Sequence, residues 1–335
     1  MTETRFDVLA IGNAIVDIIA DTDDSFIASE GLTKGSMQLI DEDRAKALYG
    51  AMGPAREISG GSAANTLAGL ARLGHKTAFI GQVADDQLGT VFAHDIRAGG
   101  IHYDIPARDG APATACCYIL VTPDAQRTMN TFLGASQFLP ASVIDKGLIE
   151  SAAILYLEGY LWDPEEPRAA MRTAIDVARA AGRKVALTLS DAFVISRHGP
   201  DFLAEMEAGR IDILFSNEVE ICALNGNDDF EASVAAIATK VPLLVCTRGE
   251  HGAIAIENGV RTEVSAEPVS KLVDTTGAGD LFAAGVFAGL AQGRPMADCL
   301  TMGAVCAAEI ISHYGARPEA DIAVLVKTRL DQRIF

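Results

Sequence analysis

The sequence predicts an α/β fold, with a mostly parallel sheet covered by helices on both faces and a small β-sheet lid. Short segments rich in apolar and β-branched residues alternate with longer segments whose apolar residues recur at helical spacing. Strand–helix–strand alternation of this kind is typical of a parallel sheet that is buried on both faces. Two stretches richer in polar and turn residues break the alternation, which favours a second, smaller sheet.

The strands predicted for the main sheet are short and mostly apolar. They cover Phe6–Ile11, Thr77–Val83, Ala153–Leu157, Lys184–Leu189, Ile211–Phe215 and Pro242–Cys246. The helices predicted between them cover Ala63–Leu73, Gln87–Ala98, Glu166–Ala181 and Phe230–Lys240. Gly74 and Gly182 lie just past two of these helices, where a left-handed C-terminal cap favours glycine.

The lid is predicted from two inserted segments, at about residues 14–40 and 102–133. The second segment contains two expected strands, Thr114–Val121 and Gln126–Phe132, joined by a hairpin turn at Thr122–Ala125. No internal repeat, low-complexity tract or interdomain linker is evident in the chain. One α/β domain over residues 1–335 with a β lid therefore fits better than two independent domains.

The composition excludes several classes of protein. Hydrophobic residues make up 49% of the 335 residues, so the chain can bury a sizeable core and is not intrinsically disordered. Lys and Arg number 27 against 45 Asp and Glu, which gives a net charge of −18. Such a field repels nucleic acids and anionic membranes. A small anionic ligand remains compatible with it, provided that backbone N–H groups and a metal screen the ligand's charge.

A cytoplasmic location is expected. The N-terminal residues lack the basic region and cleavage pattern of a signal peptide, and no apolar run reaches the ~18–20 residues that span a bilayer. The six cysteines lie in apolar segments and form no CxxC pair, so we expect reduced core residues rather than disulfides or zinc ligands. They are Cys116, Cys117, Cys222, Cys246, Cys299 and Cys306.

Polar residues follow the ends of five predicted strands. They are Asn13 and Asp17, Glu158 and Gly159, Ser190 and Asp191, Asn217 and Glu220, and Thr247 and Arg248. Ligands of open parallel sheets bind beyond the carboxyl ends of the strands, so these residues predict a site at that edge of the sheet.

The segment Asp274–Asp280 is followed at once by an apolar helix. Gly277, Ala278 and Gly279 can turn several backbone N–H groups in one direction, and the helix adds its unpaired N–H groups and positive dipole end. This arrangement suits an anion hole for a transferring phosphoryl group. Asp280 can then accept a proton from an attacking hydroxyl. A glycine-rich turn in which Asp280 only balances the helix dipole explains the same residues, and both interpretations stay open.

Two further segments open helices. Gly60 and Gly61 would let a polyhydroxylated ligand approach the backbone, with Asn65 as donor and acceptor, although a tight turn into a packed helix explains them equally well. Glu220 can bind Mg²⁺ through water. Its spacing from Asn217 is also that of a capping box, and the two interpretations are compatible.

Other catalytic signatures are absent from the sequence. It contains no P-loop, no H-E-x-x-H and no G-x-S-x-G motif, and no dinucleotide fingerprint follows the first strand. A P-loop NTPase and a dinucleotide-dependent dehydrogenase are therefore disfavoured. The six histidines show no metal-binding spacing.

Four segments, in this order, resemble the PfkB (ribokinase-like) carbohydrate kinase family. They are Gly60-Gly61-x-x-x-Asn65 (N-terminal signature), Asn217-x-x-Glu220 (Mg²⁺ and phosphate motif), Thr247–Gly252 (nucleotide loop) and Asp274–Asp280 (C-terminal signature). The resemblance covers essentially the whole chain. It implies a ribokinase-like fold and an enzyme that phosphorylates an alcohol with ATP and Mg²⁺.

Within this family, Gly12–Asp17, Leu187–Phe193 and Asp212–Asn217 are similar to segments of adenosine kinases. By that resemblance Asp17 binds ribose hydroxyls, residues of the lid line the pocket, and Phe193 lies against the adenine ring. The implied substrate-binding residues are Asn13, Asp17, Met37, Gly60, Gly61, Ser62, Asn65, Met129, Thr131, Leu133, Leu161, Phe193 and Asp280. The implied nucleotide-binding residues are Arg127, Asn217, Thr247, Arg248, Gly249, Gly252, Gly277 and Gly279, with Glu220 holding Mg²⁺ through water.

The resemblance thus implies phosphorylation of the 5′-hydroxyl of adenosine, with Asp280 as general base and Gly277–Gly279 as anion hole. A sugar kinase of the ribokinase or fructokinase kind stays open as an alternative, because the segment Gly60–Asn65 is equally at home there. A non-catalytic nucleoside binder is a third hypothesis, which the intact Asp280 disfavours. The family includes monomers and homodimers, and it places an activating K⁺ near Asp274 and Ser312–Gly315.

Overall fold

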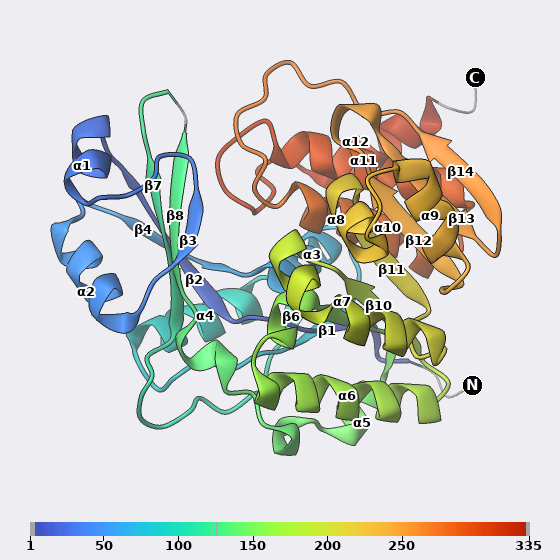
Figure 1. Ribbon diagram of the computed structural model, residues 1–335, viewed down its shortest axis with the longest axis horizontal. Helices are drawn as coiled ribbons and strands as arrows, with labels where there is room; N and C mark the ends of the chain where they lie inside the picture. The colour runs from blue at the N-terminus through green and yellow to red at the C-terminus, as the bar shows by residue number, and fades with distance from the viewer. Residues whose placement is uncertain (1–3, 125, 333–335) are drawn as a thin grey trace.

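The computed structural model describes residues 4–124 and 126–332. Within them the chain forms a large sheet with helices on both faces and a smaller sheet beside it, at the left of Figure 1. The α/β class predicted from the sequence, with one large sheet covered by helices and a second, smaller sheet, is confirmed.

The large sheet has nine strands in the described residues, and those from β12 to β6 run parallel. In spatial order they are β14 (Val260–Val264), β13 (Ala253–Glu257), β12 (Leu243–Thr247), β11 (Ile213–Asn217), β10 (Lys184–Thr188), β9 (Ala152–Glu158), β1 (Phe6–Ile11), β5 (Thr77–Ile80) and β6 (Ile101–His102). β13 and β14 form an antiparallel edge that the sequence interpretation missed.

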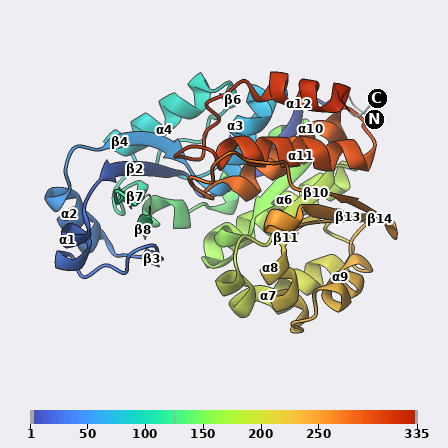
Figure 2. The same ribbon diagram turned by 90° about the horizontal axis from the view of Figure 1, so that it is seen from above.

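Helices cover both faces of the large sheet (Figure 2). One face carries α3 (Ser62–Arg72), α4 (Gln87–Ala98), α10 (Ala278–Ala291), α11 (Met296–Ile310) and α12 (Ile322–Asp331). The other carries α5 (Lys146–Glu150), α6 (Glu165–Ala180), α7 (Ala192–Glu207), α8 (Glu218–Asn225) and α9 (Phe230–Ala238). Each face has its own apolar core because residues alternate across every strand. Leu9 and Ile11 pack on one side of β1, whereas Val8 and Ala10 pack on the other.

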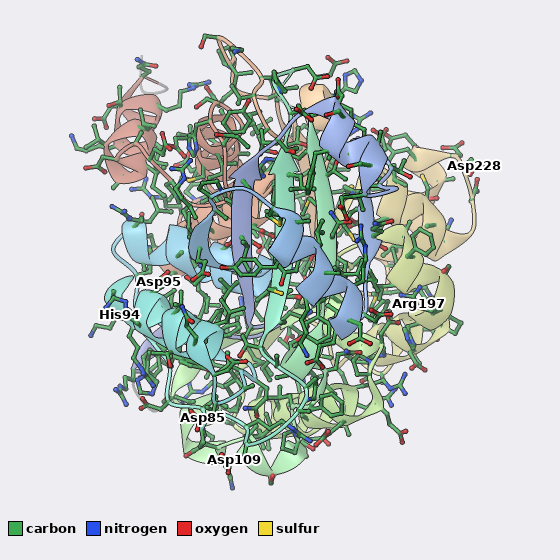
Figure 3. The ribbon with its side chains drawn as sticks, turned by 90° about the vertical axis from the view of Figure 1, so that its left-hand side faces the viewer. Asp85, His94, Asp95, Asp109, Arg197 and Asp228 are labelled. Atoms are coloured by element: carbon green, nitrogen blue, oxygen red, sulfur yellow. The ribbon has the colours of Figure 1, made fainter. Side chains whose placement is uncertain are left out.

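The smaller sheet, called the lid sheet below, has five strands in the order β3 (Met37–Leu39), β8 (Arg127–Phe132), β7 (Ala115–Val121), β2 (Ile15–Asp21) and β4 (Arg56–Gly60). The helices α1 (Asp24–Ser29) and α2 (Glu42–Ala51) lie beside it, as Figure 3 shows from the lid side. β7 and β8 pair antiparallel, as predicted for the hairpin. The predicted turn at Thr122–Ala125 includes Ala125, which lies outside the described residues.

The lid sheet differs from the two predicted segments at its borders. β4 belongs to it, although residues 56–60 lie outside both segments, because this strand pairs with β2 before the chain enters α3. His102, in contrast, ends the short edge strand β6 of the large sheet. Within the described residues no helix is long and apolar enough to cross a membrane.

Candidate active site

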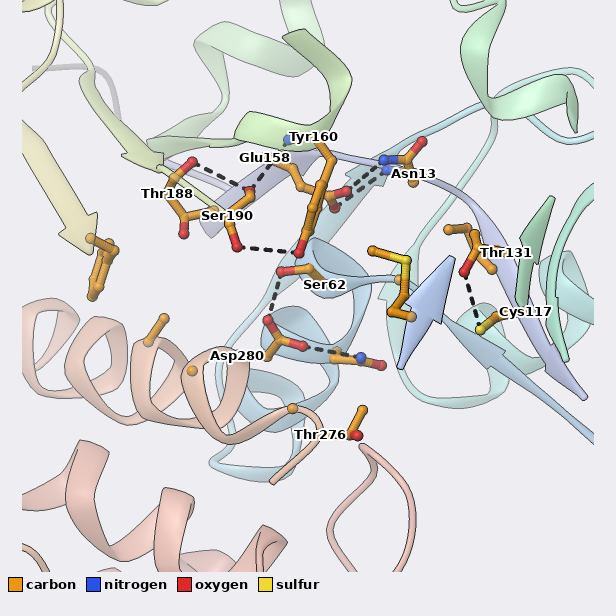
Figure 4. A pocket seen from close by; sticks show the side chains of 18 of the residues that line it. Asn13, Ser62, Cys117, Thr131, Glu158, Tyr160, Thr188, Ser190, Thr276 and Asp280 are labelled. Atoms are coloured by element: carbon orange, nitrogen blue, oxygen red, sulfur yellow. Dashed lines mark hydrogen bonds between the residues drawn. The ribbon is translucent and has the colours of Figure 1, made fainter. Parts of the chain in front are cut away.

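A cavity of about 400 Å³ lies where the carboxyl ends of the large-sheet strands meet the lid sheet (Figure 4). Both sheets contribute to its lining, with Thr188 at the end of β10, Ser190 just after it, and Met129 and Thr131 on β8. The predicted site residues that line it are Asn13, Asp17, Met37, Gly61, Ser62, Asn65, Met129, Thr131, Leu133, Asn217, Glu220, Thr247, Gly277, Gly279 and Asp280. Residues more than 260 positions apart in the sequence thus share one cavity.

Asp280, in the first turn of α10, is held by two donors from α3. Ser62 Oγ donates to Asp280 Oδ1 at 2.6 Å, and Asn65 Nδ2 donates to Asp280 Oδ2 at 3.2 Å (Figure 4). Burial raises the pKa of Asp280, whereas these two hydrogen bonds and the positive charge of Arg317 oppose the rise. A buried, oriented carboxylate in a cavity has the properties of a general base.

The start of α10, where the anion hole is predicted, presents backbone amides at the cavity. Gly277 precedes the helix with φ +77°, and a Cβ on it would lie 2.7 Å from Ala316 Cβ, so both conformation and space favour glycine. Leu281 N–H donates the first intrahelical hydrogen bond, to Gly277, so the amides of Gly279 and Asp280 precede the hydrogen-bonded ladder. Such amides, together with the helix dipole, stabilise a bound anion.

Asp17, on β2, is a second buried carboxylate in the cavity. Burial raises its pKa to about 6, and the charges of Arg317 and Arg127 oppose the rise. Gly60 does not line the cavity, but a Cβ at this position would clash with the Asp17 carboxylate. Gly61 has φ +94°, and a Cβ there would clash with the Asn13 carbonyl oxygen. The two glycines therefore let the turn into α3 pass close to Asn13 and Asp17.

Glu158, at the end of β9, is a third buried carboxylate, to which the sequence interpretation gave no role beyond a place at the rim. Its oxygens accept from Asn13 Nδ2 at 2.7 Å, from Asn13 N–H at 3.3 Å and from Ala63 N–H at 3.0 Å. Burial raises its pKa to about 7, with these hydrogen bonds acting in the opposite direction. Glu158 thus joins the segment after β1 to the start of α3.

The aromatic residues that line the cavity are Tyr156, Tyr160, Phe215 and Phe282, and Phe193 is not among them. Phe193 lies in the first turn of α7 with 74% of its surface exposed, because Asp191 caps the helix and directs this turn outward. The Tyr160 hydroxyl donates to the Ser190 carbonyl at 3.2 Å, which fixes the ring (Figure 4). Leu161, another predicted contact, is 1% exposed and packs in the hydrophobic core instead.

Other lining residues were given no individual binding role from the sequence. They are Ile15, Leu39, Cys117, Tyr156, Thr188, Phe215, Ser216, Thr276, Phe282 and Ala283, in addition to Glu158, Tyr160 and Ser190. Thr188 and Ser216 lie at the carboxyl ends of β10 and β11, the edge at which ligands of parallel sheets bind. Cys117 instead requires knowledge of which face of β7 meets the cavity. Thr131 Oγ1 donates to Cys117 Sγ at 3.3 Å, so the two lid strands present a joint surface.

Only some of the residues predicted to bind the nucleotide line the cavity. Asn217 and Glu220 form a reciprocal capping box at the start of α8, with Asn217 Nδ2 donating to Glu220 Oε1 at 2.6 Å. Burial raises the pKa of Glu220 to about 7. Thr247 lines the cavity, whereas Arg248 lies over the Phe230 ring. Gly249 and Gly252, in the turn after β12, and Ala278 do not line it.

Arg127, predicted to bind nucleotide, is almost fully buried at the lid border. Its Nη1 lies 2.7 Å from Asp274 Oδ2, which links β8 to the loop before α10. Apart from this ion pair, the guanidinium has no hydrogen-bond partner in the described residues. Arg127 is not among the residues that line the cavity. Asp274 also accepts from Thr276 N–H at 3.1 Å and Gly315 N–H at 3.3 Å.

The described residues offer a metal ion isolated carboxylates rather than a cluster of ligands. Among residues 4–124 and 126–332, no group of three His, Cys, Asp or Glu side chains is arranged to hold a metal ion. Glu220 nevertheless fits a Mg²⁺ ion that keeps most of its water, because it is a buried carboxylate at the cavity.

The chain matches a family model described as pfkB family carbohydrate kinase over residues 6–323. It is 44% identical to an adenosine kinase from Sinorhizobium meliloti of known crystal structure, with a TM-score of 0.91 over 97% of this chain and 100% of that one. A probable sugar kinase from Rhizobium etli CFN 42 is equally similar, with 44% identity and a TM-score of 0.91 over 97% and 99% of the two chains. A probable fructokinase-7 from Arabidopsis thaliana is 29% identical over 78% of this chain and 81% of its own length.

Proposed function

The chain belongs to the pfkB family of carbohydrate kinases, and from that premise we propose that it transfers the γ-phosphoryl group of ATP to the 5′-hydroxyl of adenosine. The observation that carries the proposal is the make-up of the cavity, whose lining includes two sets of side chains. The carboxylates of Asp17 and Asp280 are called the polar end below, and the apolar side chains of Met37, Met129 and Leu133 the apolar end. A nucleoside has the same two parts, a hydroxylated sugar and a flat base. The similarity to the Sinorhizobium meliloti adenosine kinase supports this assignment.

At the polar end, Asp17 and Asn65 accept and donate hydrogen bonds to the ribose hydroxyls. The Oδ1 atom of Asn65 is buried without a hydrogen-bond partner in the described residues, so it is available to a substrate hydroxyl. The Gly61 turn lets the sugar approach the backbone. At the apolar end, Met37, Met129 and Leu133 pack against the base.

In the transfer step, Asp280 takes the proton of the 5′-hydroxyl as the hydroxyl oxygen forms a bond to the γ-phosphorus of ATP. The bond from that phosphorus to the bridging oxygen breaks, and ADP leaves. The amides at Gly277–Gly279 stabilise the charge on the phosphoryl oxygens. General-base assistance is typically worth about 10²–10⁴-fold in rate.

Other groups serve the phosphate chain of the donor. Arg127 supplies a buried guanidinium with unsatisfied donors, and Thr247 a hydroxyl at the cavity wall. Glu220 would hold Mg²⁺ through water, and the bound ion would neutralise phosphate charge. In a chain with a net charge of −18, such local positive groups are needed for ATP to bind.

A free sugar is the second candidate acceptor. The fructokinase relative supports it, and so does the number of hydrogen-bonding groups at the polar end. The two candidates differ at the apolar end, because a free sugar leaves Met129 and Leu133 without a partner.

The test is to mix purified protein with Mg·ATP and to measure ADP release with adenosine, inosine, ribose and fructose offered separately. We expect adenosine to be used at micromolar concentration and to block phosphorylation of any sugar in a mixed assay. Preference for a free sugar would replace the adenosine assignment and keep the kinase chemistry. Absence of ADP release with every acceptor would favour a non-catalytic nucleoside binder.

A further inference from the structure

Arg317 lies in the segment between α11 and α12, and its guanidinium binds both ends of the turn that leads from β4 into α3. Nε and Nη2 donate to the Ser59 carbonyl at 3.1 and 2.8 Å, and Nη2 also reaches Ser59 Oγ at 3.2 Å. Nη1 donates to the Ala64 carbonyl at 3.1 Å. A planar fork of this kind holds two acceptors in a fixed relation, which a lysine cannot do.

The turn between Ser59 and Ala64 carries the groups that orient the proposed general base. Gly61 and Ser62 lie within it, and Asn65 follows it, so Arg317 acts on the donors of Asp280 without contacting Asp280 itself. The two residues before Arg317 support the other half of the site. Gly315 N–H donates to Asp274, and Ala316 packs on Gly277. One segment therefore holds the α3 turn and the start of α10 together.

The charge of Arg317 is also unusual in its surroundings. Within residues 4–124 and 126–332, no carboxylate lies within ion-pair distance of the guanidinium, although the group is buried. Three acidic groups raise the pKa of Arg317 through their negative charge, and they come from three elements: Asp17 on β2, Asp280 on α10 and Asp95 on α4. Asp95 is labelled in Figure 3. Asp95 Oδ2 accepts from Ser59 N–H at 3.2 Å. Burial lowers the pKa of Arg317 to about 10, so the group stays protonated at neutral pH.

We infer that Arg317 is a positioning residue for the phosphoryl transfer: it fixes the Ser59–Ala64 turn against α10 and supplies the buried positive charge that acts on both Asp17 and Asp280. This role rests on the proposed kinase function. Arg317 does not line the cavity, so it acts through the two carboxylates and the turn rather than on the substrate.

The positive charge of Arg317 lowers the pKa of both Asp17 and Asp280. Burial raises the pKa of Asp17 to about 6 and also raises that of Asp280, and Arg317 opposes both shifts. Arg127 opposes the shift of Asp17 as well, whereas Asp280 adds to it. Removing the charge of Arg317 therefore raises the pKa of both carboxyl groups, so a larger share of Asp280 is protonated and unable to accept a proton at neutral pH.

The experiment compares Arg317→Gln and Arg317→Lys with the wild type, using pH profiles of kcat/KM. For Arg317→Gln we expect a loss of about tenfold or more at pH 7 and an acidic limb moved up by about one pH unit. Arg317→Lys keeps the charge and loses the fork. Its acidic limb should stay at the wild-type position while kcat/KM still falls.

The matched control is Arg183→Gln. Arg183 is also buried and donates from Nε to the Glu150 carbonyl, but it precedes β10 and so lies at the end of the sheet opposite the cavity. Its loss should lower the melting temperature and leave the pH profile of the folded enzyme unchanged. A purely structural role for Arg317 would give the same pattern as this control, and that result would overturn the inference.

Two further outcomes keep the test decisive. If Arg317→Gln does not fold, wild-type kcat/KM in Arg317→Lys would still overturn the inference, because the fork would then be dispensable. If the wild type prefers an acceptor other than adenosine, the adenosine assignment fails by itself, and the same profiles are recorded with the preferred acceptor.

Discussion

Ser62 Oγ lies 2.6 Å from Asp280 Oδ1 and joins the N-terminal glycine segment to the C-terminal one, across 218 positions of the sequence. The first segment opens α3 and the second opens α10. The hydrogen bond favours the ionised form of Asp280, because a hydroxyl donates more strongly to a carboxylate than to a neutral carboxyl group. Ser62 of the first segment thus orients the carboxylate of Asp280 in the second.

Ser62→Ala tests this contact. Burial raises the pKa of Asp280 and Ser62 counteracts the rise, so loss of the hydroxyl should raise the pKa further. We expect kcat/KM at pH 7 to fall by about three- to tenfold and the acidic limb to move to higher pH, with little change at pH 9. The matched control is Ser25→Ala, whose hydroxyl donates to the exposed Asp23. An unshifted limb in Ser62→Ala would show that this hydrogen bond does not control Asp280.

Asp280→Asn should abolish the proton transfer while preserving the shape of the site. An amide can still accept a hydrogen bond from Ser62, but it cannot take a proton. Turnover with adenosine should fall by about 10²–10⁴-fold, with nucleotide affinity in equilibrium binding largely retained. Asp163→Asn, at an ion pair with Arg197 outside the cavity, is the control for loss of a carboxylate charge. Undiminished turnover in Asp280→Asn would remove this residue from the base role.

Much of the fold was predictable because periodicity reports burial. β1 and α4 have the predicted bounds, and α3 and α6 are displaced by one residue. The β13–β14 hairpin was not predicted, since β14 is an exposed edge strand whose alternation is short and polar. α1 was also missed. It is a short helix that depends on its Asp23 cap rather than on an apolar stripe.

Which residues line the cavity was predictable where a sequence motif contains them, as for Asp280 and Asn65. Among the residues assigned by resemblance alone, the lid residues Met37, Met129, Thr131 and Leu133 line the cavity. Phe193 instead points to solvent and Leu161 into the core, because their positions depend on how α7 and the turn after β9 begin. Arg317 carried no signal, since its acceptors are backbone carbonyls 258 and 253 positions away. No side-chain pattern encodes such a contact.

Met129→Ala tests the apolar end of the cavity. Truncation removes apolar surface that a base would bury, worth about 1–2 kcal/mol, so KM for adenosine should rise about tenfold with kcat nearly unchanged. KM for any free sugar that the enzyme accepts should not change, because a sugar does not reach this residue. Met52→Ala, at the end of α2 and outside the cavity lining, controls for general loosening of the lid. Equal effects on both acceptors would contradict the assignment of the base to this end.

Glu158→Gln should make stability less dependent on pH. Burial raises the pKa of Glu158 from 4.5 to about 7, so the folded state binds a proton that the unfolded state has released between these values. Wild-type stability from this group therefore falls as pH rises from about 4.5 to 7 and levels off above 7. Glutamine does not titrate. Relative to the wild type, the free energy of unfolding of the variant should therefore increase by about 3 kcal/mol from the lower to the upper end of that pH range.

The measurement for Glu158→Gln is the free energy of unfolding in urea at pH 4.5, 6 and 8, taken as the difference between variant and wild type. This difference cancels the pH dependence of the other carboxylates, which the net charge of −18 makes large. Glu150→Gln, at a half-exposed ion pair with Lys146, is the control for replacing a carboxylate by an amide. A constant difference for Glu158→Gln would mean that folding does not raise the pKa of Glu158.

Gly279→Ala is expected to affect turnover but not stability. Gly279 lines the cavity in the first turn of α10, and a Cβ built on it meets no heavy atom within 4 Å, so the fold has room for a methyl group. Alanine favours helix over glycine by about 0.5–1 kcal/mol, and the melting temperature should hold or rise. The methyl group would nevertheless stand in the proposed anion hole, where phosphoryl oxygens must approach the backbone amides. We expect kcat to fall by at least about 10²-fold.

The companion variant Gly277→Ala should behave in the opposite way on stability. Its φ of +77° and the close approach of Ala316 make any side chain costly there, by about 1–3 kcal/mol. Thermal denaturation and steady-state kinetics on the two variants therefore distinguish a glycine kept for conformation from one kept for the ligand. If Gly279→Ala were as active as the wild type, the phosphoryl group would have to bind elsewhere than at the start of α10.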